Sequence, residues 1–154
     1  MSQHHLSPED FGKIVRLTPL VAIDFVLHDP DGRILLGLRN NEPAKDTYFV
    51  PGGIIRKDEK LSHAFARILK VETGLEIPMT NARLLGAFEH FYPNNRLNEP
   101  GYGTHYIVLA HELRLASRPE IQLDDQHGDS VWWTPSEILA SPKVHENTKA
   151  YFRA

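Results

Sequence analysis

The sequence predicts an α+β fold, in which a sandwich-like set of strands is flanked by helices. Strand patterns occur on both sides of one long amphipathic helix pattern, and further helix signals follow near the end of the chain. A parallel βαβ array would alternate strands and helices one by one, and this order does not. Since 154 residues can bury a sizeable core, we expect one domain over residues 1–154.

The first strands are marked by apolar runs and turn residues. Leu20 to Leu27 is apolar except for Asp24, which is the pattern of a buried strand. Asp29 to Gly32 has the composition of a turn, and Arg33 to Arg39 returns as a second strand. An unpaired carboxylate inside an apolar strand is costly, so Asp24 is a candidate site residue.

The central helix is predicted from about Glu59 to Thr73, with Asp58 as its N-cap and Gly74 as its stop. Its apolar face is formed by Leu61, Ala64, Phe65 and Ile68. Glu72 falls in the middle of that face and in the last turn, where the helix dipole disfavours an anion. Such a carboxylate needs a cation or a proton, unless the helix end frays and exposes it.

The second half of the chain predicts three more strands and two short helices. The strands run from Arg83 to Tyr92, from His105 to Leu113 and, more briefly, from Val131 to Trp133. Thr134 to Glu137 contains a capping threonine, a proline at the first helical position and a glutamate at the third. Val144 to Phe152 is predicted as the last helix.

Composition excludes several classes of function. The formal net charge of −3 gives no general attraction to nucleic acid or to an anionic membrane, so we expect neither as a partner. The chain has no cysteine, which excludes disulfides, thiolate metal sites and cysteine nucleophiles. No apolar run suits a signal peptide or a membrane span, and we expect a cytoplasmic protein.

One motif extends from the strand region into the central helix. Its fixed positions are Gly53, Glu59, Arg67, Leu69, Glu72, Gly74 and Leu75, directly after Pro51 and Gly52. This spacing resembles the Nudix box, G-x5-E-x7-R-E-U-x-E-E-x-G-U, where U is a bulky apolar residue. The resemblance implies a Nudix-type mixed β-sheet sandwich flanked by helices, and a hydrolase that needs Mg²⁺.

The sequence departs from the full box at Ile68 and Val71, where that box has glutamates. Ordinary Nudix enzymes use the glutamate cluster to hold more than one Mg²⁺ and hydrolyse by attack at phosphorus. With fewer carboxylates, we expect one Mg²⁺ per active site, for which Mn²⁺ can substitute. One cation is enough to neutralise a departing diphosphate, so the departures favour a change in the bond that breaks.

This depleted box resembles that of the GDP-mannose mannosyl hydrolase branch of the Nudix superfamily. The branch hydrolyses at the sugar carbon and releases GDP and free sugar, with inversion expected at the anomeric centre. The similarity extends over nearly the whole chain. Its segments are 18–21, 24–25, 36–39, 48–53, 90–92, 104–106, 125–127, 144–145 and 150–152.

The resemblance implies a metal site and a general base. Glu72, Gln126 and the carbonyl of Gly52 are the implied Mg²⁺ ligands. His127 is the implied base that activates water at the anomeric carbon. A histidine suits this role because it titrates near neutral pH.

The resemblance also implies the groups that hold the substrate. Arg39, Tyr106 and His90 would stabilise the charge that develops on the leaving GDP. Arginine suits this role because its charge is permanent and its shape matches phosphate oxygens. Asp24 would contact the sugar, and Arg67 would orient the region of the metal-binding carboxylate and contact substrate.

Further departures bear on the substrate. The branch usually has an arginine directly after the two glycines, where this chain has Ile54. Arg56, on the same face of an extended segment, would take its place in substrate binding. Glu89 stands where a neutral glutamine is common and would add negative charge near the site.

Two other functions stay open at this point. One is a Nudix pyrophosphohydrolase that attacks phosphorus in a nucleotide sugar or nucleoside diphosphate derivative. The other is a non-catalytic nucleotide-binding module. The partner expected in each case is a small nucleotide-derived molecule. The family resemblance also implies a homodimer, formed through the N-terminal segment around Phe11.

Overall fold

The computed structural model describes residues 6–121 and 127–153, with residues 127 and 128 described by their backbone alone. The strands are β1 Leu20–His28, β2 Ile34–Arg39, β3 Tyr48–Phe49, β4 Gly52–Ile54, β5 Arg83–Tyr92, β6 Thr104–Arg114 and β7 His127–Trp133. The helices are α1 Pro8–Leu17, α2 Leu61–Thr73, α3 Pro135–Ala140 and α4 Glu146–Lys149, with 3₁₀ turns at Met79–Asn81 and Ala150–Phe152.

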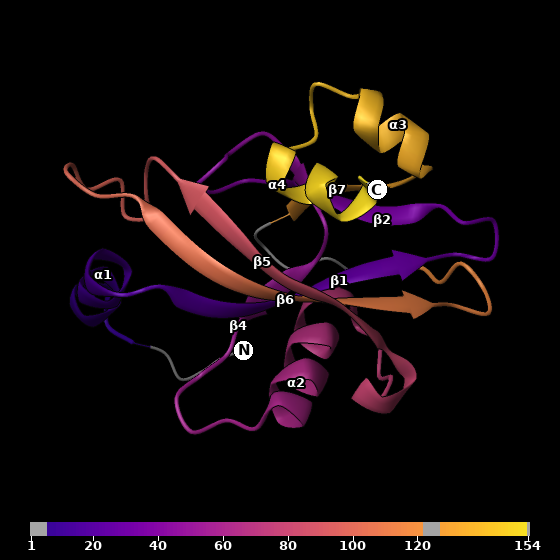
Figure 1. Ribbon diagram of the computed structural model, residues 1–154, viewed down its shortest axis with the longest axis horizontal. Coiled ribbons are helices and arrows are strands. Elements are labelled where there is room, and N and C mark those ends of the chain that lie inside the picture. The colour runs from indigo at the N-terminus through magenta and orange to yellow at the C-terminus, as the bar shows by residue number, and fades with distance from the viewer. Residues whose placement is uncertain (1–5, 122–126, 154) are drawn as a thin grey trace.

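The strands form a mixed sheet, which confirms the predicted α+β class. The order is β3-β2-β1-β6-β5, with β4 paired to β1 and β7 paired to β2. The central β1–β6 pair is parallel, and the other named pairs are antiparallel. Helix α2 lies on one side of the sheet, whereas α3 and α4 lie on the other (Figure 1).

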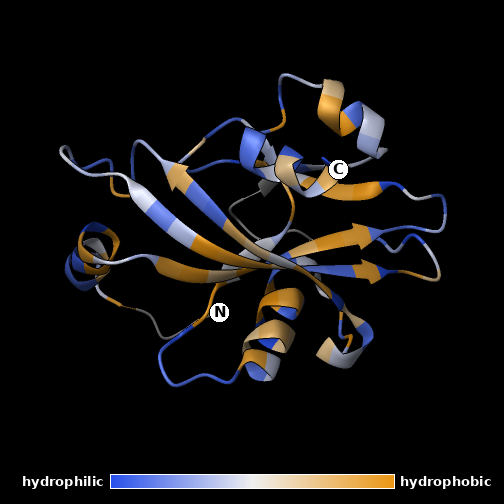
Figure 2. Cartoon of the chain, viewed as in Figure 1, coloured by the Kyte–Doolittle hydropathy of each residue, from blue (hydrophilic) through white to orange (hydrophobic). Residues whose placement is uncertain are grey.

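The alternation of side chains along β1 serves both sides of the sheet. Ile23, Phe25 and Leu27 are fully buried against α2. The ring of Phe25 meets that of Phe65 edge to face, with their centroids 5.0 Å apart. Val26 points the other way, into a second core cluster with Ile34, Leu36, Val50, Ile138 and Val144. Figure 2 shows β1 and β2 in apolar colours and the turn that joins them as largely hydrophilic.

Helix α2 begins two residues later than the sequence predicts, and Asp58 is not its N-cap. Lys60 is the N-cap and supplies no side-chain hydrogen bond. Asp58 has φ of 65°, a left-handed conformation that belongs to the preceding turn, whereas an N-cap needs an extended backbone. Leu61, expected on the apolar face, is 47% exposed because it starts the first turn. Gly74 ends the helix with φ of 80°, as predicted.

The two ends of the chain differ from the expected pattern. Helix α1 was not predicted, although Ser7 caps it by accepting from the amide of Asp10 and a proline stands at its start. The last helix, expected from Val144 to Phe152, is a short α4 followed by a 3₁₀ turn. Helix α3 has the predicted capping box between Thr134 and Glu137. Among the described helices, none is long and apolar enough to cross a membrane.

The two box positions that lack glutamate lie in different environments. Ile68 is 1% exposed and packs against Gly53, where an added Cβ would come within 3.0 Å of its side chain. Val71 is 49% exposed on the outer face of α2. Restoring the carboxylate therefore has a different cost at each position.

We expect Ile68→Glu to lower the free energy of unfolding of the metal-free protein by about 3 kcal/mol or more, because it buries an uncompensated charge. Val71→Glu should change it by less than about 0.5 kcal/mol, as surface substitutions usually do. Urea denaturation with a chelator present measures both. Equal losses in the two variants would show that residue 68 is not enclosed as described.

A buried carboxylate holds the turn between β1 and β2. Oδ1 of Asp29 accepts from the amides of Asp31 and Arg33, at 2.9 and 2.8 Å. Oδ2 accepts from the guanidinium of Arg118, at 2.7 and 2.9 Å. Burial would raise the pKa of Asp29, but the hydrogen bonds from Arg33, Arg118 and Asp31 outweigh it and hold the pKa below its usual value.

We expect Arg118→Ala to lower stability at pH 7, and the loss to disappear as the pH falls. A lowered pKa in the folded state adds stability above the unfolded pKa of about 3.9, and this is lost as pH falls through the folded pKa. The difference in urea midpoint between wild type and Arg118→Ala, at pH 7 and near pH 3, measures this loss of stability. Lys57→Ala, which removes an exposed pair with Asp58, is the control and should change little at either pH. If wild type and Arg118→Ala differ as much at low pH as at pH 7, the ion pair with Asp29 is not the cause of the loss.

Candidate active site

The Pro51-Gly52-Gly53 segment brings β4 against β1 at Asp24. Asp24 and Gly52 are direct partners in the antiparallel β1–β4 pair. A Cβ on Gly52 would lie 2.1 Å from Oδ1 of Asp24 and 2.6 Å from the carbonyl oxygen of Ile23. Glycine is therefore required at position 52 for the carboxylate of Asp24 to lie where it does.

Asp24 belongs to a chain of three polar side chains from three different elements. The hydroxyl of Tyr151 donates to Oδ2 of Asp24 at 2.5 Å. The same hydroxyl lies 3.3 Å from Nε2 of His90 on β5. A phenol has one proton, and here it goes to the carboxylate. The second contact is then a hydrogen bond from Nε2–H of His90 to the phenol oxygen.

Burial sets the protonation of this cluster. It raises the pKa of Asp24 to about 7, although the Tyr151 hydrogen bond and the charge of Arg39 favour the carboxylate. Burial, with the nearby His145, lowers the pKa of His90 to about 4. Burial also raises the pKa of Tyr151. At neutral pH the imidazole and the phenol are uncharged, and Asp24 is poised between its two forms.

Arg39, at the end of β2, supplies the positive charge of the site. Its Nε donates to the carbonyl of Pro43 at 3.0 Å, and its guanidinium lies 5.5 Å from the ring centroid of Phe49. Its charge acts on Asp24 and also on Tyr106. Burial raises the pKa of Tyr106, which keeps its hydroxyl as a neutral donor. Tyr106 is the direct partner of His90 in the β5–β6 pair.

Strand pairing brings the backbone of His127 beside Arg39. The two residues are partners in the β2–β7 pair, after a register shift that follows Gly37. The sequence predicted a strand only from Val131, and β7 begins at His127 instead. Gln126, a predicted Mg²⁺ ligand, lies outside the described residues.

The other predicted metal ligands are Glu72 of α2 and the carbonyl of Gly52 in β4. Glu72 is 5% exposed in the last turn of α2, one turn beyond Ile68, which packs against Gly53 of β4. The carboxylate of Glu72 and the carbonyl of Gly52 are the hard oxygen donors that Mg²⁺ prefers. Within the described residues no group of three His, Cys, Asp or Glu side chains could hold a metal. By their chemistry, these two donors suit one hard cation, which would take its other ligands from elsewhere.

Arg67 is held by its own chain. Its Nε and Nη2 donate to the two carboxylate oxygens of Glu59, at 2.7 and 2.9 Å, and Nη2 also donates to the carbonyl of Ile54. The amide of Arg56 donates to Glu59 as well, at 3.0 Å. The hydrogen bond from Arg67 is the main reason why the pKa of Glu59 is lowered. These contacts tie β4 and the following loop to α2.

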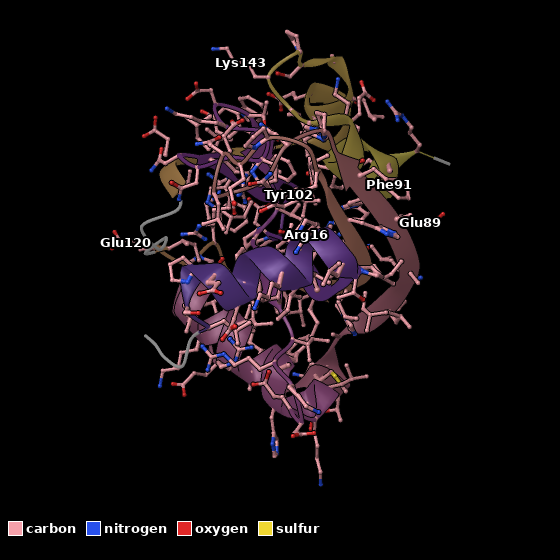
Figure 3. All side chains as sticks on the ribbon, turned by 90° about the vertical axis from the view of Figure 1, so that its left-hand side faces the viewer. Arg16, Glu89, Phe91, Tyr102, Glu120 and Lys143 are labelled. Carbon is pink, nitrogen blue, oxygen red and sulfur yellow. The ribbon has the colours of Figure 1, made fainter. Side chains whose placement is uncertain are left out.

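Glu89 lies on the face of β5 opposite the cluster, so its negative charge is not part of the cluster. Side chains alternate along β5, and His90 is buried on the cluster side while Glu89 is exposed on the other. Figure 3 shows Glu89 and Phe91 along the outer edge of β5.

A hollow of about 390 Å³ lies between α1 and the ends of β5 and β6. It is lined by Arg16, Phe91 and Tyr102, among others (Figure 3).

Sequence reasoning missed the aromatic groups that enclose the cluster. Tyr92 packs edge to face on Tyr106, with their centroids 6.0 Å apart, and His145 stacks on Phe49 at 5.0 Å. Tyr151 lies 127 residues from Asp24 in the sequence. No local spacing could indicate this contact. The only signal was the resemblance of residues 150–152 to the Nudix branch, which assigned them no role.

Comparisons with known proteins agree with this architecture. The chain is 37% identical over 132 residues to the low-salt glycan biosynthesis protein Agl8 of Haloferax volcanii, over 85% of this chain and 81% of that protein. It is 40% identical over 72 residues to an ADP-ribose pyrophosphatase of Methanocaldococcus jannaschii, which covers 47% of this chain and 41% of that protein.

Solved structures show the same fold at low identity. A MutT protein from Methanosarcina mazei matches with a TM-score of 0.69 and 17% identity, over 87% of this chain and 91% of its own. A MutT NUDIX hydrolase from Burkholderia pseudomallei matches with a TM-score of 0.70 and 23% identity, over 88% and 96%. The model of the NUDIX domain family matches residues 18–154. The chain therefore belongs to the NUDIX family and is a hydrolase that acts on nucleoside diphosphate derivatives.

Proposed function

We propose that this protein hydrolyses a GDP-hexose, with GDP-mannose as the expected substrate, to GDP and free sugar by attack of water at the anomeric carbon. The pairing of Arg39 with His127 is the observation that supports this most directly. It brings the backbone of His127, the proposed base, beside Arg39, which is proposed to stabilise the charge on the leaving GDP. The fully buried Ile68 supports it as well, since a second glutamate-bound metal has no carboxylate there.

In the proposed reaction, a proton of water passes to His127 while the water oxygen bonds to the anomeric carbon. The bond from that carbon to the diphosphate oxygen breaks, and GDP leaves with the electron pair. Arg39 stabilises the charge that appears on the leaving oxygen, and the neutral Tyr106 hydroxyl donates to it. Attack opposite the diphosphate inverts the anomeric centre.

The proposed metal is one Mg²⁺, held by Glu72, the carbonyl of Gly52 and Gln126. When bound, it neutralises charge on the departing diphosphate. Arg67 ties β4 and the following loop to α2 through Ile54 and Glu59, and these two elements carry the proposed ligands Gly52 and Glu72. We include Arg56 as a substrate-binding cation on the adjoining loop. We also propose that the chain forms a homodimer.

A second candidate is pyrophosphohydrolysis, which the similarity to an ADP-ribose pyrophosphatase favours. Isotope transfer separates the two reactions. In ¹⁸O-labelled water with Mg²⁺ and GDP-mannose, we expect the label in the free sugar and none in phosphate. Chelation with EDTA should abolish turnover, and added Mg²⁺ should restore it. Label in a phosphate product would establish attack at phosphorus, and a chain that binds without turnover would be a binding module.

The proposed base has its own test. We expect His127→Gln to lower kcat by about 10²–10⁴-fold, the usual contribution of general base catalysis, with little change in KM. Steady-state kinetics with GDP-mannose measure both constants. His63→Gln, on the outer face of α2, is the matched control and should behave as wild type. If His127→Gln also behaves as wild type, His127 is not the base.

The required glycine gives a further prediction. Gly52→Ala should remove most activity, because the added Cβ cannot coexist with the carboxylate of Asp24 or the carbonyl of Ile23 at the distances above. It should also lower the melting temperature, since one of these atoms is backbone and cannot swing away. Kinetics and thermal denaturation measure the two effects. Full activity in this variant would show that β4 and β1 do not approach as described.

A further inference from the structure

Tyr151 lies at the centre of the polar cluster, yet the proposed reaction gives it no role. Its hydroxyl donates to Oδ2 of Asp24 at 2.5 Å and faces Nε2 of His90 at 3.3 Å. It thereby joins β1 to β5 from the 3₁₀ turn Ala150–Phe152 that follows α4. A hydroxyl that only filled space would not need two polar partners at these distances.

The ring of Tyr151 is fixed by packing. It meets the ring of Phe88 edge to face, with centroids 4.8 Å apart and planes at 86°. The ring of the next residue, Phe152, also meets it edge to face, with centroids 6.5 Å apart. Because these contacts limit the motion of the ring, the hydroxyl presents its proton to Asp24 from one direction and orients the carboxylate.

The two oxygens of Asp24 are not equivalent in this arrangement. Within the described residues, the only hydrogen-bond donor to the carboxylate is Tyr151, and it reaches Oδ2. Oδ1 lies over Gly52, where only the absence of a side chain leaves it room. Asp24 keeps part of its surface exposed. Oδ1 is therefore the oxygen left to accept a hydrogen bond from a sugar hydroxyl.

We propose that Tyr151 is a positioning residue: by holding Oδ2 of Asp24, it directs Oδ1 toward a hexose hydroxyl and so favours nucleotide sugars over nucleoside diphosphates. This inference rests on the proposed function, in which Asp24 contacts the sugar. It predicts an effect confined to the sugar half of the ligand. The diphosphate contacts proposed for Arg39 do not depend on Tyr151.

The variant Tyr151→Phe keeps the ring and its contacts with Phe88 but removes the hydroxyl. We expect its KM for GDP-mannose to rise about tenfold or more, as for loss of a hydrogen bond to a charged group, while its Kd for GDP stays within about twofold of wild type. Calorimetry with GDP and steady-state kinetics with GDP-mannose measure the two ligands. Equal weakening of both would show a general structural role and overturn the inference, as would no change in either.

A double-mutant cycle tests whether Tyr151 acts through Asp24. In an Asp24→Asn background, Tyr151→Phe should add less than about a twofold loss, because the oriented carboxylate is already gone. Independent, multiplying losses would overturn the inference. Tyr102→Phe is the matched control, since its hydroxyl also donates to a carboxylate, Glu99, at 2.8 Å but outside the cluster. Tyr102→Phe should leave the KM for GDP-mannose and the Kd for GDP unchanged.

The binding comparison also separates this inference from the proposed reaction. A wild-type chain that binds GDP-mannose more tightly than GDP but cleaves it at phosphorus would overturn the proposed reaction. The double-mutant cycle of Asp24 and Tyr151 would then decide the role of Tyr151. A wild-type chain that binds GDP-mannose no better than GDP would overturn the sugar contact of Asp24, and the role of Tyr151 with it. Melting temperatures of all variants exclude unfolding as the cause.

Discussion

The close approach of β4 to β1 and α2 is the constraint on which the rest of the site depends. Two consecutive glycines face opposite sides of the sheet, and each leaves room for one neighbour. Gly52 admits the carboxylate of Asp24 on one side, and Gly53 admits Ile68 of α2 on the other. A side chain at either position would separate the layers. Strand β4 therefore lies between α2 on one side and the polar cluster on the other.

The cluster concentrates polar groups where water is largely excluded. Asp24, His90 and Tyr151 are joined by hydrogen bonds, and Arg39 provides the permanent charge nearby. Such networks are costly when incomplete, since each unpaired group bears its desolvation penalty. Burial that raises the pKa of Asp24 to about 7 is a sign of that penalty. A protein selected for stability alone would place apolar side chains here.

Much of the fold could be predicted from the sequence, because its signals are local. The apolar run of β1, the capping box at Thr134 and the stop at Gly74 each depend on a few neighbouring residues. Strand β4 has only three residues, two of them glycine, and no periodicity can indicate it. In the site, Asp24 could be recognised from the sequence because it is a charged residue within an apolar strand. Tyr151 could not, because only the folded chain brings it to Asp24. The roles of individual residues rested on resemblance.

The parallel pairing of β1 with β6 bears on how the chain folds as it is synthesised. Leu20 is paired with Tyr106 and His28 with Arg114, so the middle strand of the sheet waits for a partner made much later. Until then its apolar residues are exposed on the growing chain, and long-range pairings of this kind form slowly. Transient shielding of β1 until β6 has been made would therefore favour correct pairing over aggregation.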